Sequence, residues 1–483
     1  MSNHIEPANP ETREEHTNHA EVVVGGQEED TVQKDKKQFL TGQDVYNDAE
    51  LDAEEEDEGR VKGPKKRGIF AVTDGMGKCF RYMIPPGGYV ASAFTLGSAT
   101  LGTGILGLPA AFNSMGLITS ILILLVIVVF TIFSLWLMAR CADATGLRTY
   151  AEISEAILGY WPSVLISVFL VFFCLGTDVS YVISIGDLLT PIFDDDSVPK
   201  FLRTKQGNRL IVSMIWLVCI YPLCLLKSID SLRHVSTFAV LAVAFFCICI
   251  LVNCIEHLRS EGMRDDVFFF NTGNQAIVGL GSLLFACLVQ MNAFEIYHQM
   301  NNPSPRRMVH VSCLGLGTCG IFYFTSGIFG YIRFGSTVID SILLEYQPRE
   351  DKEMWVSYFG MVIKLCVGFI LHQIPIRDSF YHYMGWDVYR MKWWKNCIYC
   401  TIFSVIVLIA GLFIPSINIV LGLVGSLCGG FVGLIYPPLM VMYCGNWSLK
   451  TAGIVEYVAM YILLLIGIVG CVFGTAASIY GVV

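Results

Sequence analysis

The sequence predicts an all-α polytopic membrane protein with eleven transmembrane helices. Of the 483 residues, 54% are hydrophobic and only 15% are charged, whereas soluble domains have about 25% charged residues. Residues 117–138 carry no charge at all, and about 20 apolar residues form a helix that crosses the hydrocarbon core. Lipid offers no hydrogen-bond partner to the backbone, so each such run must be helical. The alternating pattern of a membrane β-strand is absent.

Apolar runs recur along the chain and define the expected spans. Residues 149–158 instead place apolar side chains at helical spacing opposite Glu152 and Glu155, which predicts an interfacial helix before span three. Soluble connections are expected at residues 194–208, 256–271, 333–353 and 375–395. The spans are expected near residues 88–112, 116–140, 161–193, 209–226, 235–255, 274–299, 308–331, 354–374, 397–414, 417–442 and 453–477.

The ends of the chain differ in composition from its apolar part. Residues 1–60 are rich in acidic side chains, with a run at 54–58, and this composition predicts a disordered acidic cytoplasmic tail. Residues 61–87 form a basic juxtamembrane segment, which suits anionic lipid headgroups and places the N-terminus in the cytoplasm. The transmembrane domain is expected at residues 88–477, followed by a short C-terminal end at 478–483.

Four glycines and a proline fall within the first expected span, at residues 97–109. This composition disfavours a continuous helix. A break at mid-depth must face protein or a water-filled cavity, and it presents free N–H groups to an anion such as a carboxylate. Alternatively, Gly102 and Gly104 allow close helix packing. The hydroxyls of Thr100 and Thr103 beside them favour a binding site.

Residues 102–116 read Gly-x-Gly-Ile-Leu-x-Leu-Pro-x-Ala-Phe-x-x-x-Gly. This motif closely resembles the first span of the amino acid/auxin permease family, within the amino acid–polyamine–organocation superfamily and similar to its protozoan branch. The resemblance continues at residues 285–297, 302–308 and 374–377. It implies a fold of two inverted five-helix repeats, in which helices 1 and 6 are broken and helix 11 is an addition.

The resemblance also implies where a substrate binds. The carboxylate of an amino acid would meet the N–H groups of Gly102, Thr103 and Gly104, and the transmembrane part would be a transporter domain. The substrate ammonium would meet backbone carbonyls near four residues, Ala99, Thr100, Phe285 and Ala286.

Two departures from the family pattern bear on the coupling ion. Sodium-coupled relatives place an amide side chain at the position of Ser98, and they favour hydroxyls within span eight, where residues 365–370 have none. A hard cation needs several oxygen ligands. The sequence therefore favours proton coupling or uniport, independent of sodium.

Ionisable residues inside spans are costly and are usually functional. Asp178, Glu295 and Lys364 are therefore the candidates for coupling or gating. Asp178 is expected to bind a cationic substrate side chain, to exchange a proton, or to pair with Lys364. Tyr181 lies one turn further along the same face and is expected in the pocket. Glu295 is expected to gate or pack, and Asp187 is expected to be a surface acid near the outer end of span three.

Several functional classes are excluded. The sequence has no phosphate-binding loop, HExxH motif or nucleophile elbow, so it predicts neither an enzyme nor a cofactor. His298, His372 and His382 are expected at cytoplasmic helix ends, where they would cap the helices rather than bind a metal. Most of the 17 cysteines lie in apolar runs, which argues against a disulfide framework. The basic run 62–67 is too short for a nucleic-acid surface.

Taken with the resemblance, these features predict a secondary active amino acid transporter that works by alternating access. Its expected partners are an amino acid substrate, the lipid bilayer and protons. Asp178 favours a cationic substrate, arginine or lysine. A neutral amino acid is the alternative if Lys364 neutralises that acid, and a sensor that binds without transport is a further alternative. The plasma membrane is the expected location, with a lysosomal or vacuolar membrane left open.

Overall fold

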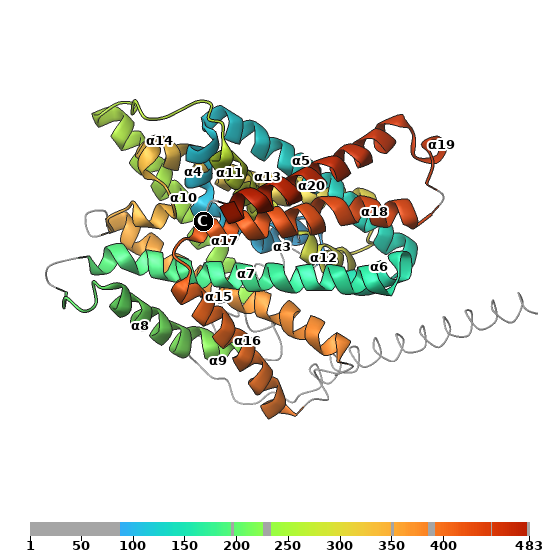
Figure 1. Ribbon diagram of the computed structural model, residues 1–483, viewed down its shortest axis with the longest axis horizontal. Helices are drawn as coiled ribbons and strands as arrows, with labels where there is room; N and C mark the ends of the chain where they lie inside the picture. The colour runs from blue at the N-terminus through green and yellow to red at the C-terminus, as the bar shows by residue number, and fades with distance from the viewer. Residues whose placement is uncertain are drawn as a thin grey trace, which may run out of the picture. The chain divides into compact units, whose positions relative to one another are not determined.

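The structure is a computed structural model that describes residues 87–194, 198–225, 233–348, 352–384, 392–445 and 447–480. Within these ranges all regular secondary structure is helical (Figure 1), which confirms the all-α prediction. The predicted acidic tail, nearly all of the basic juxtamembrane segment and residues 481–483 lie outside the described residues.

The described part has ten helices that are long and apolar enough to cross a membrane, and a bent pair of helices supplies the eleventh span. This confirms the predicted number of spans. The bent pair is α3 (Tyr89–Thr100) with α4 (Gly104–Met115), and the others are α5 (Leu117–Thr145), α7 (Tyr160–Phe193), α8 to α9 (Lys205–Cys224), α10 (Arg233–Ser260), α11 to α12 (Asn274–Gln299), α13 to η6 (Pro305–Thr337), α15 (Lys352–Tyr383), α16 (Trp393–Phe413), α17 to α18 (Ile417–Tyr443) and α20 (Ile454–Tyr480).

The short helix α6 (Tyr150–Leu158) confirms the helix predicted before span three. Its first turn is closed by a capping box in which the Thr149 hydroxyl and the Glu152 carboxylate each accept a backbone N–H. Gly146, at φ 68°, ends the preceding helix α5 in the left-handed conformation that glycine adopts without strain. Local sequence thus specifies this turn.

Span eight is longer than the sequence suggests. The connection predicted at residues 375–395 is helical as far as Tyr383, because α15 continues through Pro375. Neighbouring helices can supply the hydrogen bonds that a proline removes from a membrane helix. The last helix, α20, likewise extends to Tyr480, beyond the boundary predicted at residue 477.

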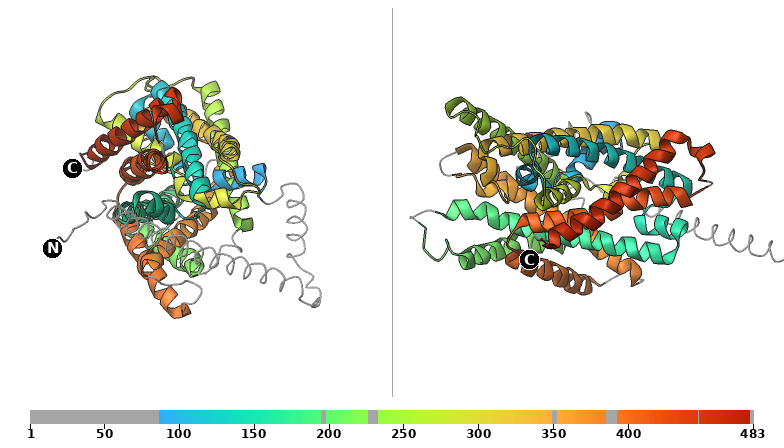
Figure 2. Two further views of the ribbon diagram at one scale, coloured as in Figure 1. Left: turned by 90° about the vertical axis from the view of Figure 1, so that its right-hand side faces the viewer. Right: turned by 45° about the horizontal axis from the view of Figure 1, so that its top comes forward.

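Burial separates central spans from lipid-facing ones. The apolar window of α17 to α18 is 78% buried, whereas those of α16 and α20 are 28% and 33% buried. Helix α20 packs across the π-helical segment η8 (Gly425–Ile435) of span ten and presents its other face outward (Figure 2). This position suits a helix added outside two repeats.

The predicted breaks in spans one and six are both present. α3 and α4 bend by 63° at their junction. α11 (Asn274–Cys287) ends before a short 3₁₀ turn, η4 (Gln290–Asn292), and α12 (Ala293–Gln299) completes span six. The residue after each first half, Leu101 and Leu288, is extended, with ψ 92° and 103°. The breaks lie five spans apart, as two five-helix repeats require.

Candidate functional site

The break in span one leaves backbone donors unused. The N–H groups of Gly102, Thr103 and Gly104 have no hydrogen-bond partner among the described residues. Gly102 is partly exposed, whereas Thr103 and Gly104 are buried. These donors stand at the N-terminus of α4, where the helix dipole favours negative charge. The arrangement suits a carboxylate, as the sequence predicts.

The two broken spans touch each other at this point. A Cβ atom built on Gly104 would lie 2.7 Å from the Cα and 2.8 Å from the Cβ of Ala286 in α11. Both interpretations of the glycines therefore apply, since the helix is broken and one glycine also permits close packing. Phe285, the other residue expected here from span six, is buried, and its ring packs against that of Phe173.

Tyr323 of α13 (Pro305–Phe324) joins the two breaks. Its hydroxyl lies 2.8 Å from the carbonyl oxygen of Thr100 and 2.6 Å from that of Ala286, and its side chain is buried. The hydroxyl has one proton, which either carbonyl can accept. The two carbonyls are among those that the resemblance assigns to the substrate ammonium, and each keeps a second lone pair. Sequence analysis missed Tyr323, although a phenol in an apolar span needs a polar partner.

Helix α7 forms the facing wall of the break. The hydroxyls of Thr103 and Ser180 lie 2.5 Å apart. The Tyr181 hydroxyl would lie 3.3 Å from a Cβ on Gly102, and the same ring fills the space beside Gly368 of α15. The structure therefore places Tyr181 at the break, where the sequence predicts it.

His372 does not cap a cytoplasmic helix end, and that prediction is wrong. Because α15 runs to Tyr383, His372 lies well inside the helix. Its ring centroid is 5.6 Å from that of Tyr181, and its Nδ1 lies 2.9 Å from the carbonyl oxygen of Gly368. His372 therefore supports the tyrosine at the break.

Asp178 and Lys364 do not form the ion pair that was one of the alternatives. Within the described ranges, Asp178 accepts a hydrogen bond from Gln373 Nε2 at 2.7 Å, and its Oδ1 atom has no partner. Lys364 Nζ instead lies 3.5 Å from the carbonyl oxygen of Ser98. Gln373 and Lys364 are nine residues apart on α15, about 14 Å along its axis. Asp178 therefore lies beside a different part of α15 from Lys364.

Of two other residues that the sequence analysis selected, Glu295 lies away from the break and Ala99 lies beside it. Glu295 is exposed on α12 and accepts a hydrogen bond from Gln299 at 3.2 Å. Ala99 precedes the break and is partly exposed. The break in span six is held by Gln290, which accepts the Val289 N–H at 3.0 Å. The site therefore gathers residues from spans one, three, six, seven and eight, but not Glu295.

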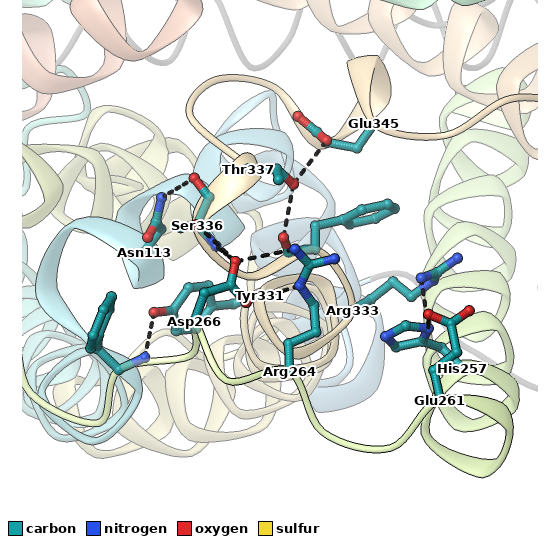
Figure 3. A network of polar contacts seen from close by, with 12 residues as sticks. Asn113, His257, Glu261, Arg264, Asp266, Tyr331, Arg333, Ser336, Thr337 and Glu345 are labelled. Atoms are coloured by element: carbon teal, nitrogen blue, oxygen red, sulfur yellow. Dashed lines mark hydrogen bonds and ion pairs between the residues drawn. The ribbon is translucent and has the colours of Figure 1, made fainter.

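A polar network lies at the end of the bundle where α4 finishes (Figure 3). The Arg264 guanidinium contacts both carboxylate oxygens of Asp266, at 2.9 and 3.2 Å. The same carboxylate accepts the backbone N–H and hydroxyl of Ser336, at 3.0 and 2.7 Å. Asn113 of α4 donates to the carbonyl of Val338 at 3.1 Å. These contacts connect the loop after span five to the C-terminal ends of spans one and seven.

Replacing Asp266 with asparagine is expected to destabilise the protein at neutral pH. Arg264 and Ser336 hold the pKa of this carboxyl well below its ordinary value, so its contribution is present above about pH 4 and is lost as the pH falls through the folded-state pKa. Thermal unfolding of the purified protein at pH 7, where the contribution is fully present, measures the effect. Asp265→Asn, at the exposed neighbour, is the matched control. Equal melting temperatures for the two variants would contradict the assignment.

Comparison with known proteins shows the family to which the chain belongs. Residues 86–480 match the family described as "Transmembrane amino acid transporter protein". "Sodium-coupled neutral amino acid transporter 7" of Xenopus laevis is 27% identical over 417 residues, which cover 80% of this chain and 86% of the relative. The protein of the same name from Danio rerio is 23% identical over 367 residues, covering 73% and 78%.

"Amino acid transporter AVT6E" of Arabidopsis thaliana is 23% identical over 417 residues, covering 81% of this chain and 83% of the relative. The family match confirms the resemblance to the amino acid/auxin permeases and the prediction of a multi-pass membrane transporter rather than an enzyme. The chain therefore belongs to the family of transmembrane amino acid transporter proteins.

Proposed function

We propose that this chain transports a neutral amino acid by alternating access, with the substrate bound where spans one and six are broken. The observation that carries the proposal is the set of N–H groups at residues 102–104, which have no partner among the described residues and lie beside a second broken helix. The carboxylate meets these donors, and the substrate ammonium meets the carbonyls of Thr100 and Ala286. Opening this site alternately to each side moves the amino acid without any covalent step.

The charges around the break favour a neutral substrate over a cationic one. The buried Lys364 ammonium contacts the Ser98 carbonyl, one turn of helix before the break. A positive charge there attracts the substrate carboxylate and repels a cationic side chain. Arginine and lysine were favoured only because Asp178 was expected to face the substrate, whereas its carboxylate contacts Gln373. Two of the relatives are named as neutral amino acid transporters.

For the coupling ion we propose a proton that binds to Asp178. A buried carboxylate with a single hydrogen bond needs a proton or a cation as a counter-charge, and Asp178 Oδ1 lacks any partner in the described part of the chain. A sodium ion would need several oxygen ligands, and the Ser98 carbonyl beside the break already contacts an ammonium. Since two relatives are named as sodium-coupled, sodium coupling is the alternative to test.

Uptake by proteoliposomes tests both proposals. Labelled alanine and glutamine are expected to accumulate when the interior is alkaline, and arginine and lysine are expected to compete poorly. Each experiment is repeated with an inward sodium gradient at equal pH. Accumulation driven by sodium alone would overturn the coupling proposal, and preferred uptake of arginine would overturn the substrate proposal. Binding without flux under any gradient would indicate a sensor.

Replacing Asp178 with asparagine is expected to abolish the acceleration of uptake by a pH gradient, because asparagine carries no exchangeable proton. Exchange of external labelled substrate for internal unlabelled substrate at equal pH is expected to persist, since the break itself is unchanged. Asp194→Asn, at the exposed acid that directly follows the same helix, is the matched control and should keep the response to pH. An undiminished pH response in the Asp178 variant would make this residue structural.

The plasma membrane is the location we propose for the transporter. Imaging of the full-length chain with a fluorescent tag, against markers of the cell surface and of acidic compartments, tests the proposal. Retention in a lysosomal or vacuolar membrane would contradict it.

A further inference from the structure

Two cysteines from different spans lie close together at one end of the bundle, beside Arg140. Cys141 is fully buried in the last turns of α5, and Cys444 directly follows α18 (Tyr436–Tyr443) and is partly exposed. Helices α5 and α18 pack against each other, and both cysteines line the same cavity. The residues are some 300 positions apart in the chain, so only the tertiary fold brings them together.

The pair opens onto a cavity of about 220 Å³. A water molecule occupies about 30 Å³ in the liquid, so the cavity admits small molecules such as hydrogen peroxide. Both cysteines line the cavity, and its wall also includes Arg140, Trp447 and Thr451. A small oxidant can therefore reach the place where the two cysteines lie together.

Charge at the cavity favours a thiolate. The Arg140 guanidinium lines the same cavity and pairs with Glu456 of α20. The neighbouring Cys141 thiol and the positive charge of Arg140 lower the pKa of Cys444 below its ordinary value. A thiolate is the nucleophilic form of cysteine. Cys444, the exposed member, is therefore the one that an oxidant meets first.

We propose that Cys141 and Cys444 form a redox-sensitive dithiol that peroxide converts to a disulfide. The Cys444 thiolate attacks one oxygen of hydrogen peroxide, which breaks the O–O bond, releases hydroxide and leaves a sulfenic acid. The Cys141 sulfur then attacks that sulfur and displaces water as its proton is transferred to the leaving oxygen. Two thiols and one peroxide thus give one disulfide and two waters. A thiol reductant such as glutathione reverses the reaction by exchange.

The bond would restrain the transport cycle. Helix α5 packs against α4, α11 and α12, which belong to the two broken spans, whereas Cys444 belongs to the end of span ten. A disulfide would fix the inner end of span two to that of span ten. Motion of the broken spans relative to span ten would then be blocked, and transport would stop until the bond is reduced.

Two other cysteines of the described chain serve as controls, because they lie away from the cavity at Cys444. Cys428 and Cys471 lie inside spans, and their thiols donate to the carbonyls of Phe169 and Leu427 at 3.5 and 3.7 Å. Neither lines the cavity at Cys444. The double variant Cys428→Ser with Cys471→Ser is therefore a matched control.

The test treats the purified full chain with hydrogen peroxide, blocks remaining thiols by alkylation, and maps linked peptides by mass spectrometry. A peptide joining Cys141 to Cys444 is expected, and it should disappear after reduction. In Cys141→Ser, Cys444 is expected to stop at the sulfenic acid and to react with dimedone, whereas in the unmodified sequence it should not. This readout does not depend on transport.

Uptake into proteoliposomes supplies the second readout. Peroxide is expected to reduce uptake to the level of empty liposomes and dithiothreitol is expected to restore it, while Cys444→Ser remains active throughout. The control double variant should respond as the unmodified sequence does. Absence of the linked peptide, with other thiols oxidised, would overturn the proposal. If peroxide inhibits uptake by Cys444→Ser as strongly as uptake by the unmodified sequence, the proposal that the disulfide restrains transport is overturned.

Discussion

Replacing Gly104 with valine is expected to abolish amino acid uptake while leaving the protein inserted in the membrane. A Cβ atom at this position would lie 2.7 Å from Ala286 Cα, closer than carbon atoms approach without a shift of the backbone. Overpacking of this kind typically costs about 1–3 kcal/mol, or about 5- to 150-fold in an equilibrium. The shift would separate the two breaks and displace the donors of residues 102–104 from the substrate carboxylate.

The measurement is uptake of labelled alanine by proteoliposomes that contain equal amounts of folded protein. Gly320→Val is the matched control, because Gly320 is a buried glycine in the membrane helix α13 with no atom within 4 Å of its ideal Cβ position. The control should transport normally. Normal uptake by the Gly104 variant as well would exclude the proposed carboxylate site.

Replacing Tyr323 with phenylalanine is expected to give the second largest loss, at least about tenfold in uptake rate. The change keeps the ring and removes only the hydroxyl that lies between the carbonyls of Thr100 and Ala286. An unsatisfied buried polar group costs about 1–3 kcal/mol. Here the cost falls on the two helix ends that form the site, so their separation and the position of the substrate ammonium should both change.

Tyr358→Phe separates this effect from a general loss of stability. Tyr358 is also fully buried in a span, and its hydroxyl donates to the Leu343 carbonyl at 2.6 Å, away from the break. Both variants should lower the melting temperature by similar amounts, but only Tyr323→Phe should raise the substrate concentration for half-maximal uptake. If both variants transport equally well, Tyr323 is a packing residue.

Two kinds of polar group thus define the site. Backbone N–H groups at residues 102–104 come from a local interruption of one helix. The Tyr323 hydroxyl comes from another span and holds the interruption against span six. The proposed carboxylate site needs both, because free donors recognise an anion only if their geometry is fixed before the substrate arrives.

Composition and local pattern were sufficient to predict the number of spans and the break in span one. Long uncharged runs can be satisfied in lipid only as helices, and glycines with a proline weaken a helix wherever it lies. The largest boundary error lies near Pro375, where neighbouring helices rather than local sequence decide whether the helix continues. The prediction for His372 failed for the same reason.

Tertiary structure alone decided which polar groups meet. Asp178 contacts Gln373 rather than Lys364, Tyr323 reaches both breaks, and Cys141 lines the same cavity as Cys444. Each contact joins residues from different spans, and the sequence sets neither the rotation of one helix against another nor their relative height. The sequence by itself therefore determined a membrane protein of eleven spans with a broken first helix. The packing of those spans determined the charges and hydroxyls around the break, because helix contacts in lipid depend on the fit of whole surfaces.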